Sequence, residues 1–333
     1  MFRIATCLSL LLAFGAGPQE HRAHDPLGDV EVNVEVQVLR GSSSPIKVRG
    51  VDLGAHWDQV LAEVNNGWNH LRLRVTGSRI SIWVKGRPAL VHAHLGTTAA
   101  PLPKTGAIEL SELDGTVRWR ALTIRTLEAD EANRVLREQN AAGFTDIFDG
   151  RSFNGWAGPT DGYEIRDGAL LCKPGAGGTI YWNTPLTDFQ ARLEFALPPG
   201  GNNGLAIRYP GEGDTAYVGM TELQVLDDNY EQVRGPIDPR QAHGSAYGMV
   251  AAARGYQRPI GEWNFQEVTV RGSTVRVELN GVVILDADLA TVAPSTYMGG
   301  REHPGVTRRE GFFGFAGHSD PVRFRHIQIR RLQ

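Results

Sequence analysis

The sequence contains very little cysteine, with only Cys7 and Cys172 among 333 residues. Two thiols cannot build the disulfide framework of a small secreted scaffold, so a hydrophobic core must stabilise the fold. The chain also lacks a large net charge, because it has 34 Lys and Arg residues and 37 Asp and Glu residues. This balance gives no electrostatic reason to expect nucleic acid as a partner. The composition is that of a globular protein, and the length allows about two domains.

Long hydrophobic runs are also absent, apart from one at the N-terminus. Residues 4–16 form an apolar run of 13 residues that follows Arg3 and ends in small residues. This pattern is typical of a secretory signal peptide, whereas a membrane span needs about 20 apolar residues. We expect a signal peptide and disordered start at 1–24, and a periplasmic or secreted protein with no membrane span. A mis-set start codon or an ordinary buried strand is the alternative. Cys172, the thiol left after cleavage, is expected to be buried.

Glycine is abundant, and it separates short segments with the period of β-strands. The 40 Gly and 18 Pro residues show no collagen period, so they predict many tight turns. Residues 30–38 alternate valine with polar side chains, as a half-buried strand does. Residues 127–142 are predicted to be helical, because they are rich in Ala, Glu and Arg and lack Gly and Pro. We predict an all-β protein of the sandwich or jelly-roll type, in which a short, mostly exposed helix joins two domains. Further strands are expected at 71–75, 80–84, 189–197, 205–209, 221–226, 268–270, 275–279 and 324–329.

The chain also repeats itself. The segment Gly-Trp-Asn at 67–69 has a counterpart at 261–264, so that Trp68 and Trp263 lie 195 residues apart. Residues 117–127 match residues 322–332 at a separation of 205. Matches in the same order predict two copies of one β domain. We expect a degenerate, incomplete jelly roll at 25–127, a helical linker at 128–143 and the full copy at 144–333.

Several short motifs of the second copy occur in a recognisable order. They are Phe-Asp-Gly-Arg-Ser-Phe-Asn-Gly-Trp at 148–156, Gly-Asn-Asn-Gly followed by Arg208, Glu-x-Gln-x-x-Asp at 222–227 and Gly-Ser-Ala-Tyr-Gly at 244–248. Together they resemble the 3-keto-disaccharide hydrolase family, formerly a domain of unknown function. The resemblance covers about 190 residues. It implies a concanavalin- or laminin-G-like jelly roll at 144–333, with a shortened copy at 28–127. Near the end of the family pattern His318 is kept, but Ala316 and His326 replace a glutamine and an asparagine.

Three side chains of these motifs are candidate catalytic residues. Strand periodicity places Glu222 on the same face as Gln224, where a carboxylate beside an amide suits hydroxyl recognition and proton transfer. His318 is in a glycine-rich turn and can exchange a proton near pH 7. Arg208 is on a predicted strand and could hold a developing oxyanion. The alternatives are an exposed polar strand, an exposed turn histidine, and a salt bridge of Arg208 to Glu222 or Asp227.

Five residues are candidates for substrate binding. Tyr247 and Trp182 offer aromatic faces on which a sugar ring can stack, although most aromatic residues belong to cores. Asn203, Gln224 and Asp227 offer amide and carboxylate groups, and Asn203 alternatively shapes its turn. Oxygen atoms near Asp227 could bind Ca²⁺, but a polar turn is the simpler interpretation, and we predict no metal. We also predict no bound cofactor, since the sequence has no phosphate loop before a helix.

The resemblance implies a carbohydrate-active enzyme that cleaves the glycosidic bond of a 3-keto-disaccharide or 3-keto-glycoside. A ketone at carbon 3 acidifies the proton at carbon 2, so a base can start an elimination that is followed by hydration. Glu222, His318 and Arg208 would supply a base, an acid and a cation, and either Glu222 or His318 could be the base. A separate sugar-oxidising oxidoreductase must install the ketone. The alternative is a non-catalytic carbohydrate-binding or cell-surface module. A separation of more than about 10 Å between Glu222 and His318 would favour it.

Overall fold

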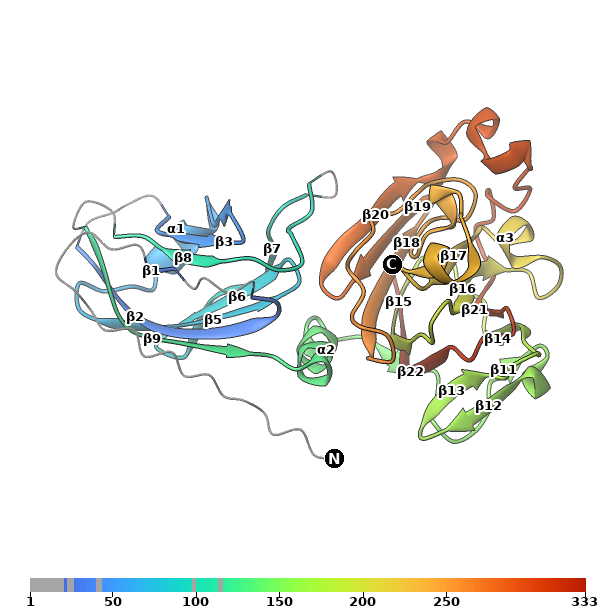
Figure 1. Ribbon diagram of the computed structural model, residues 1–333, viewed down its shortest axis with the longest axis horizontal. Coiled ribbons are helices and arrows are strands. Elements are labelled where there is room, and N and C mark those ends of the chain that lie inside the picture. The colour runs from blue at the N-terminus through green and yellow to red at the C-terminus, as the bar shows by residue number, and fades with distance from the viewer. Residues whose placement is uncertain (1–20, 23–26, 40–43, 98–99, 113–115) are drawn as a thin grey trace. The chain divides into compact units, whose positions relative to one another are not determined.

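The computed structural model describes residues 21–22, 27–39, 44–97, 100–112 and 116–333. The predicted signal peptide lies outside the described residues, except for residues 21–22. The chain divides into two compact units, Met1–Val135 and Leu136–Gln333, which we call the first unit and the second unit. Antiparallel strands build both units, which confirms the all-β prediction (Figure 1). No helix in the described part of the chain is long and apolar enough to cross a membrane.

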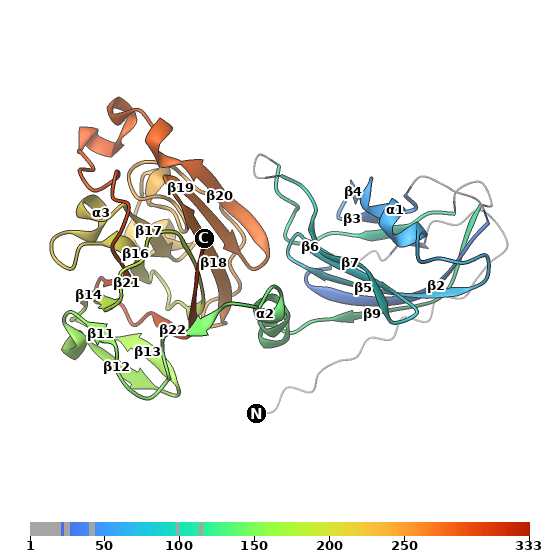
Figure 2. The same cartoon turned by 180° about the vertical axis from the view of Figure 1, so that it is seen from behind.

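The first unit contains a five-stranded and a four-stranded antiparallel sheet. The larger sheet has the order β7-β6-β5-β2-β9, and Figure 2 shows it from behind. Strand β2 (Val30–Val38) buries its valines while the residues between them stay half-buried, because successive side chains point to opposite faces. The smaller sheet has the order β1-β8-β3-β4, with strands of two or three residues. The other elements are β1 (His21–Arg22), β3 (Ile46–Val48), β4 (Val51–Asp52), α1 (His56–Leu61), β5 (Asn69–Thr76), β6 (Arg79–Val84), β7 (Arg87–His94), β8 (Ile108–Leu110) and β9 (Val117–Thr126).

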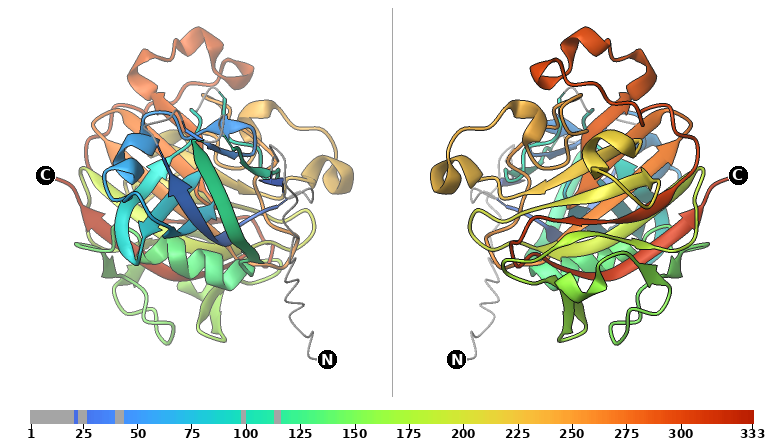
Figure 3. Two further views of the ribbon diagram at one scale, coloured as in Figure 1. Left: turned by 90° about the vertical axis from the view of Figure 1, so that its left-hand side faces the viewer. Right: turned by 90° about the vertical axis from the view of Figure 1, so that its right-hand side faces the viewer.

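The second unit is a sandwich of two antiparallel sheets. The eight-stranded sheet has the order β12-β13-β22-β15-β18-β19-β20, with β10 paired to β22. The five-stranded sheet has the order β11-β14-β21-β16-β17, and in the right-hand view of Figure 3 it lies in front of the orange strands of the larger sheet. The strands are β10 (Thr145–Asp146), β11 (Trp156–Ala157), β12 (Tyr163–Arg166), β13 (Ala169–Cys172), β14 (Gly178–Trp182), β15 (Phe189–Ala196), β16 (Asn202–Tyr209), β17 (Thr221–Leu226), β18 (Asn264–Arg271), β19 (Thr274–Leu279), β20 (Val282–Asp288), β21 (Phe312–Gly317) and β22 (Arg323–Arg331). The helices are α3 (Thr215–Val218), α4 (Tyr230–Arg234), η1 (Thr160–Gly162), η2 (Pro239–Gln241), η3 (Leu289–Thr291), η4 (Pro294–Thr296) and η5 (Met298–Gly300).

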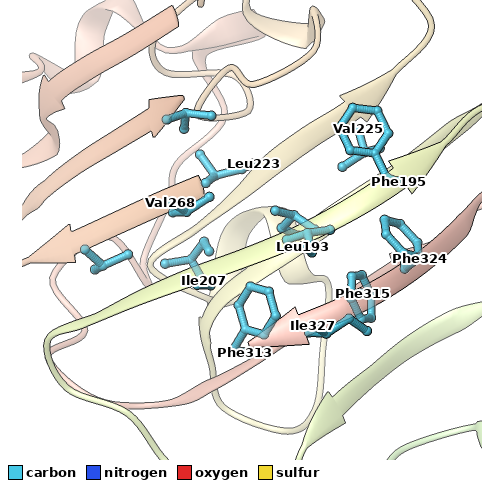
Figure 4. Close-up of a cluster of buried hydrophobic side chains, with 14 of the residues drawn as sticks. Leu193, Phe195, Ile207, Leu223, Val225, Val268, Phe313, Phe315, Phe324 and Ile327 are labelled. Carbon is cyan, nitrogen blue, oxygen red and sulfur yellow. The ribbon is translucent and has the colours of Figure 1, made fainter. Parts of the chain in front are cut away.

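Buried side chains of both sheets form the core of the second unit (Figure 4). The ring of Phe315 on β21 stacks on that of Phe324 on β22, with 4.1 Å between the centroids, and so joins the two sheets. Leu223 and Val225 of β17 belong to the same core. Cys172 is also part of it and is a free, buried thiol, as predicted. Since β17 turns its apolar residues to this core, its polar residues must face the other side of the sheet.

Helix α2 (Ala129–Glu138) lies across the boundary between the two units. The prediction that it is mostly exposed is wrong, because Val135 and Leu136 are buried. At its C-terminal end, the guanidinium of Arg137 pairs with the carboxylate of Glu194, whose side chain is 1% exposed. A buried carboxylate needs such a partner, so the end of the helix contributes to the packing of the second unit.

The larger sheets of the two units share a strand order and a register. The order β7-β6-β5-β2-β9 corresponds, strand by strand, to β20-β19-β18-β15-β22. Val36 in β2 pairs with Trp119 in β9. In the second unit Phe195 in β15 pairs in the same way with Phe324 in β22. Trp119 and Phe324, which match in the sequence, therefore occupy corresponding strands of their sheets.

Candidate active site

Strand β17 presents two polar side chains on the face opposite the core. Leu223 and Val225 are core residues, so Glu222 and Gln224 beside them point the other way. Both polar residues border a cavity of about 190 Å³. The cavity is lined by Asn202, Asp214, Ala216, Tyr217, Glu222, Gln224, Leu226, Tyr230, Ile237, Gln241, Tyr247, Arg301 and His318.

A glycine makes room for the Glu222 carboxylate. Gly204 of β16 pairs directly with Gln224 across the two strands. A Cβ atom at this position would lie 2.2 Å from Glu222 Oε1, so any side chain here would displace the carboxylate. Asn202 is two residues earlier on the same face and lines the cavity. The sequence analysis named its neighbour Asn203 instead. Alternate residues of a strand share a face, so counting back two residues from Gly204 would have indicated Asn202.

Glu222 and His318 come together at this cavity. His318 follows β21, and its Nε2 lies 3.6 Å from Glu222 Oε1. The Glu222 side chain is 4% exposed and that of His318 is 47% exposed, so the carboxylate lies behind a histidine that solvent reaches. Burial raises the pKa of Glu222, and the neighbouring Glu222 carboxylate raises the pKa of His318. Such a pair can exchange a proton with a bound ligand.

Gln224 brings an unsatisfied acceptor to the cavity. Its Nε2 donates to Asn202 Oδ1 at 2.6 Å, which fixes the orientation of the amide. Its Oε1 is buried and has no hydrogen-bond partner among the described residues. A buried acceptor without a partner is costly, so this oxygen is suited to receive a donor from a ligand, such as a sugar hydroxyl.

Two lining residues, Asp214 and Arg301, were not among the candidates from the sequence, and they lie beside Tyr217. Asp214 caps α3 by accepting from the Ala216 backbone N–H at 3.2 Å. The guanidinium carbon of Arg301 lies 3.6 Å from the ring centroid of Tyr217, and its Nη2 lies 3.6 Å from Asp214 Oδ2. Burial raises the pKa of Tyr217. No motif marks Arg301, because it belongs to a segment without strand or helix periodicity.

Tyr247, a predicted binding residue, lines the cavity. Its hydroxyl accepts from Gln241 Nε2 at 3.1 Å. Its ring meets that of Tyr217 edge to face, with 6.2 Å between the centroids. The structure therefore brings Glu222, His318, Gln224 and Tyr247 to one cavity.

Arg208 does not line the cavity, and this corrects its assignment as a catalytic cation. Its side chain is 1% exposed and bonds several groups of the scaffold. Nε donates to Thr187 O at 2.9 Å, Nη1 to Gly272 O at 2.6 Å, and Nη2 to Asp188 Oδ1 at 2.9 Å. Arg208 is buried away from the cavity and most of its N–H donors bond the scaffold, so it is not placed to hold a developing oxyanion. The proposed alternative of a salt bridge to Glu222 or Asp227 is also wrong, since the ion-pair partner is Asp188.

Three predicted binding residues also lie away from the cavity lining. Asp227 is buried, and its carboxylate accepts from the backbone N–H groups of Gly200 and Asn229, as the polar-turn alternative proposed. Asn203 is buried and accepts with Oδ1 from the next backbone N–H. Trp182 packs against the hydrophobic core from β14. Within the described residues, no group of three or more His, Cys, Asp or Glu side chains could hold a metal ion.

The second unit was compared with known protein families. Residues 143–330, more than half of the chain, match the model of the 3-keto-alpha-glucoside-1,2-lyase-like domain. The chain belongs to this family. A 3-keto-disaccharide hydrolase of Bacteroides thetaiotaomicron is 27% identical over 249 residues, which cover 62% of this chain and 85% of the relative. The family resemblance seen in the motifs of the second unit is thereby confirmed.

Solved structures of similar proteins include one from Parabacteroides distasonis that is named for a glycosyl hydrolase. It is 24% identical and covers 58% of this chain and 95% of its own, with a TM-score of 0.49. A carbohydrate-binding module of Bacillus subtilis is 15% identical and covers 56% of this chain and 95% of its own, with a TM-score of 0.30.

Proposed function

We propose that the second unit cleaves the glycosidic bond of a 3-keto-disaccharide or another 3-keto-glycoside. The observation that carries this proposal is the Glu222–His318 pair, with 3.6 Å between Nε2 and Oε1, at a cavity of about 190 Å³. The unsatisfied Gln224 acceptor and the ring of Tyr247 in the same cavity suit a hydroxyl-rich ligand. The name of the relative from Bacteroides thetaiotaomicron supports the same substrate class.

The chemistry requires proton transfer more than a nucleophile. A base removes the proton from carbon 2, next to the ketone, and the electron pair of that C–H bond forms an enolate. The enolate then expels the glycosidic oxygen from carbon 1, which takes a proton from an acid. Water adds to the new double bond and restores a 3-keto sugar. Elimination alone is a lyase reaction and elimination with hydration is a net hydrolysis, so this route accounts for both the family description and the name of the relative.

Glu222 and His318 are the acid and base of this proposal. Each has a pKa that its environment raises, so the pair can both accept a proton from carbon 2 and release one to the leaving oxygen. Either residue can be the base. A binding module without catalysis needs no such pair, and a distance of 3.6 Å gives no support to that alternative.

The direct test uses matched disaccharides. The full-length protein is incubated with a disaccharide and with its 3-keto derivative, and mass spectrometry follows the products. We expect cleavage of the 3-keto compound alone. Deuterium at carbon 2 should slow the reaction and appear in the solvent. Cleavage without an isotope effect and with full retention of deuterium would instead indicate direct hydrolysis.

Two further proposals concern the setting of this reaction. The apolar run at residues 4–16 supports export to the periplasm or secretion. Recovery of the protein from the periplasm or medium with its N-terminus removed would test export. The substrate also requires a partner activity, an oxidoreductase that converts the hydroxyl at carbon 3 into a ketone. A reaction mixture that contains a neutral disaccharide and such an oxidoreductase should yield cleaved sugar only when this protein is added.

We also propose that the first unit is a shortened copy of the same sandwich. The shared strand order and the equivalent pairing of Trp119 and Phe324 support this proposal. The two larger sheets should superpose with Trp68 on Trp263. Different strand positions for these two residues would contradict a common origin.

A further inference from the structure

We infer that Arg301 is the group that stabilises the enolate oxygen at carbon 3, and that Tyr217 and Asp214 hold it in position. This inference rests on the proposed elimination. Removal of the proton from carbon 2 places negative charge on the ketone oxygen, and a fixed cation beside that oxygen lowers the barrier. Arg208 cannot fill this role, because the scaffold uses its donors. Arg301 is the one arginine or lysine among the residues that line the cavity.

Arg301 keeps donors that Arg208 has lost. Its guanidinium carbon lies 3.6 Å from the ring centroid of Tyr217, a cation–π contact that leaves N–H groups of the guanidinium for a ligand. Its ion-pair distance to Asp214 is 3.6 Å, longer than a hydrogen bond, whereas Arg208 bonds its partners at 2.6–2.9 Å. The Arg301 side chain is 61% exposed, and it can therefore turn N–H groups toward a ligand without breaking a buried contact.

The backbone before and after Arg301 fixes where it points. Gly299 and Gly300 precede it with φ of 61° and 66°, a conformation that side chains other than glycine rarely adopt. Two residues later His303 is buried, and its Nδ1 lies 3.0 Å from Ala216 O beneath the cavity wall. The segment is thus tied to α3, the helix that carries Tyr217. This arrangement holds the backbone of Arg301 beside the cavity before the substrate binds, while its exposed side chain can still turn toward the ligand.

The charges of the cavity are then balanced in two pairs. Glu222 faces His318, and Asp214 faces Arg301. Proton transfer changes the charge of the first pair as the enolate forms, and the second pair supplies a cation that does not titrate. The long contact to Asp214 lets Arg301 shift toward the enolate while it remains near its carboxylate partner.

The test compares Arg301→Gln, Arg301→Lys and Asp214→Asn in the full-length protein. Arg301→Gln should lower kcat on the 3-keto-disaccharide by about 10²-fold, the effect of losing one oxyanion donor, with a smaller change in KM. It should lower the wash-out of deuterium from carbon 2 to the same extent. Arg301→Lys keeps the charge and should restore part of the rate. Asp214→Asn should have an intermediate effect, because it removes a positioning contact only. The matched control is Arg276→Gln on β19, whose partner is Asp286 and which does not line the cavity.

The outcomes separate this inference from the proposed function. If the wild-type protein does not cleave the 3-keto-disaccharide, the proposed function fails and the inference with it. If the wild type is active and Arg301→Gln retains its kcat within about twofold, Arg301 is not the enolate cation, while the proposed function stands. A higher KM with unchanged kcat would make Arg301 a binding residue and would also overturn the inference. Thermal unfolding of each variant identifies losses of activity that come from misfolding.

Discussion

The larger sheets of the two units have the same strand order, and the cavity belongs to the second unit. In the first unit the guanidinium carbon of Arg120 lies 4.1 Å from the ring centroid of Trp68, and in the second unit Arg325 lies 4.1 Å from that of Trp263. The second unit also has β16 and β17, which contribute Asn202, Glu222 and Gln224 to the cavity. The smaller sheet of the first unit has strands of two or three residues only. Features that both units possess therefore serve the fold, and features of the second unit alone are candidates for chemistry.

The same comparison explains the role of Arg208. Arg49 and Arg208 both adopt a positive φ, 51° and 48° respectively. Arg49 Nη1 donates to Gly77 O at 2.9 Å, and Arg208 Nη1 donates to Gly272 O at 2.6 Å. Each arginine thus holds a turn glycine of the larger sheet in its unit. Because Arg49 does so in the unit without the Glu–His pair, the arginine belongs to the scaffold.

The largest expected effect comes from removing the Glu222–His318 pair. Glu222→Gln and His318→Ala should each lower turnover of a 3-keto-disaccharide by about 10²-fold or more, the usual contribution of an acid or base. Both variants keep Gln224, Tyr247 and Arg301 and should still bind the sugar. Steady-state kinetics and calorimetric binding measure the two effects separately. Rates equal to wild type in both variants would show that chemistry does not use this pair, whatever the fold.

The second expected effect is a loss of stability that is similar in the two units. Arg208→Met should destabilise the second unit by about 3 kcal/mol, because it leaves Asp188 and several carbonyl groups without their buried partner. Arg49→Met should have a comparable effect on the first unit. Urea denaturation followed with probes in each unit measures both. If Arg208→Met unfolds normally but loses turnover, Arg208 has a catalytic role after all.

A smaller effect is expected where the chain is cut between the units. Arg137 pairs with the buried Glu194, and Arg192 Nη1 donates to Gln139 O at 3.1 Å. A fragment of residues 128–333 keeps these contacts, whereas a fragment of residues 144–333 loses them. Glu194 keeps its pair with Arg325 in the shorter fragment, and Arg192 keeps its bond to Gln328. We therefore expect the shorter fragment to be less stable by only about 1 kcal/mol, the net contribution of a lost hydrogen bond. Denaturant midpoints of the two fragments provide the measurement, and equal midpoints would show that the end of α2 is dispensable.

Much of the fold could be predicted from the sequence alone. Strand periodicity is visible within each short segment, and the matching segments are visible from their order. The valines of β2 and the matched pair Trp119 and Phe324 required only spacing and order. Glu222 and Gln224 followed from the same period, because alternate residues of a strand share a face. His318 was identified because the histidine near the end of the family pattern is kept in this sequence.

The errors concern properties that depend on contacts distant in the sequence. Arg208 has the charge of a catalytic residue, and only its bonds to Gly272 and Asp188 show that the scaffold uses it. Asp227 follows a strand directly, yet its carboxylate caps a turn instead of reaching the cavity. Arg301 could not be found, because the turn that directs it to the cavity depends on tertiary packing around α3.

The smallest expected effect is a pH dependence of the stability of the second unit, which comes from Glu222 and His318. The folded protein raises the pKa of both Glu222 and His318, so it binds protons more tightly than the unfolded chain does. Stability from such groups falls as pH rises. For His318 the contribution is fully present below about pH 6.5, the usual pKa of histidine, and is lost as pH rises through the raised pKa of the folded state.

The free energy of unfolding of the wild type should therefore exceed that of His318→Gln most at mildly acidic pH, and the difference should shrink toward pH 9. It stays small because His318 is half-exposed and water screens the pair. His92 of the first unit is a matched control, because burial lowers its pKa. The difference in free energy of unfolding between the wild type and His92→Gln should therefore grow as pH rises. A difference between wild type and His318→Gln that grows with pH would mean that the folded state lowers the pKa of His318. That result would leave the histidine neutral at the cavity and make Glu222 alone the proton carrier.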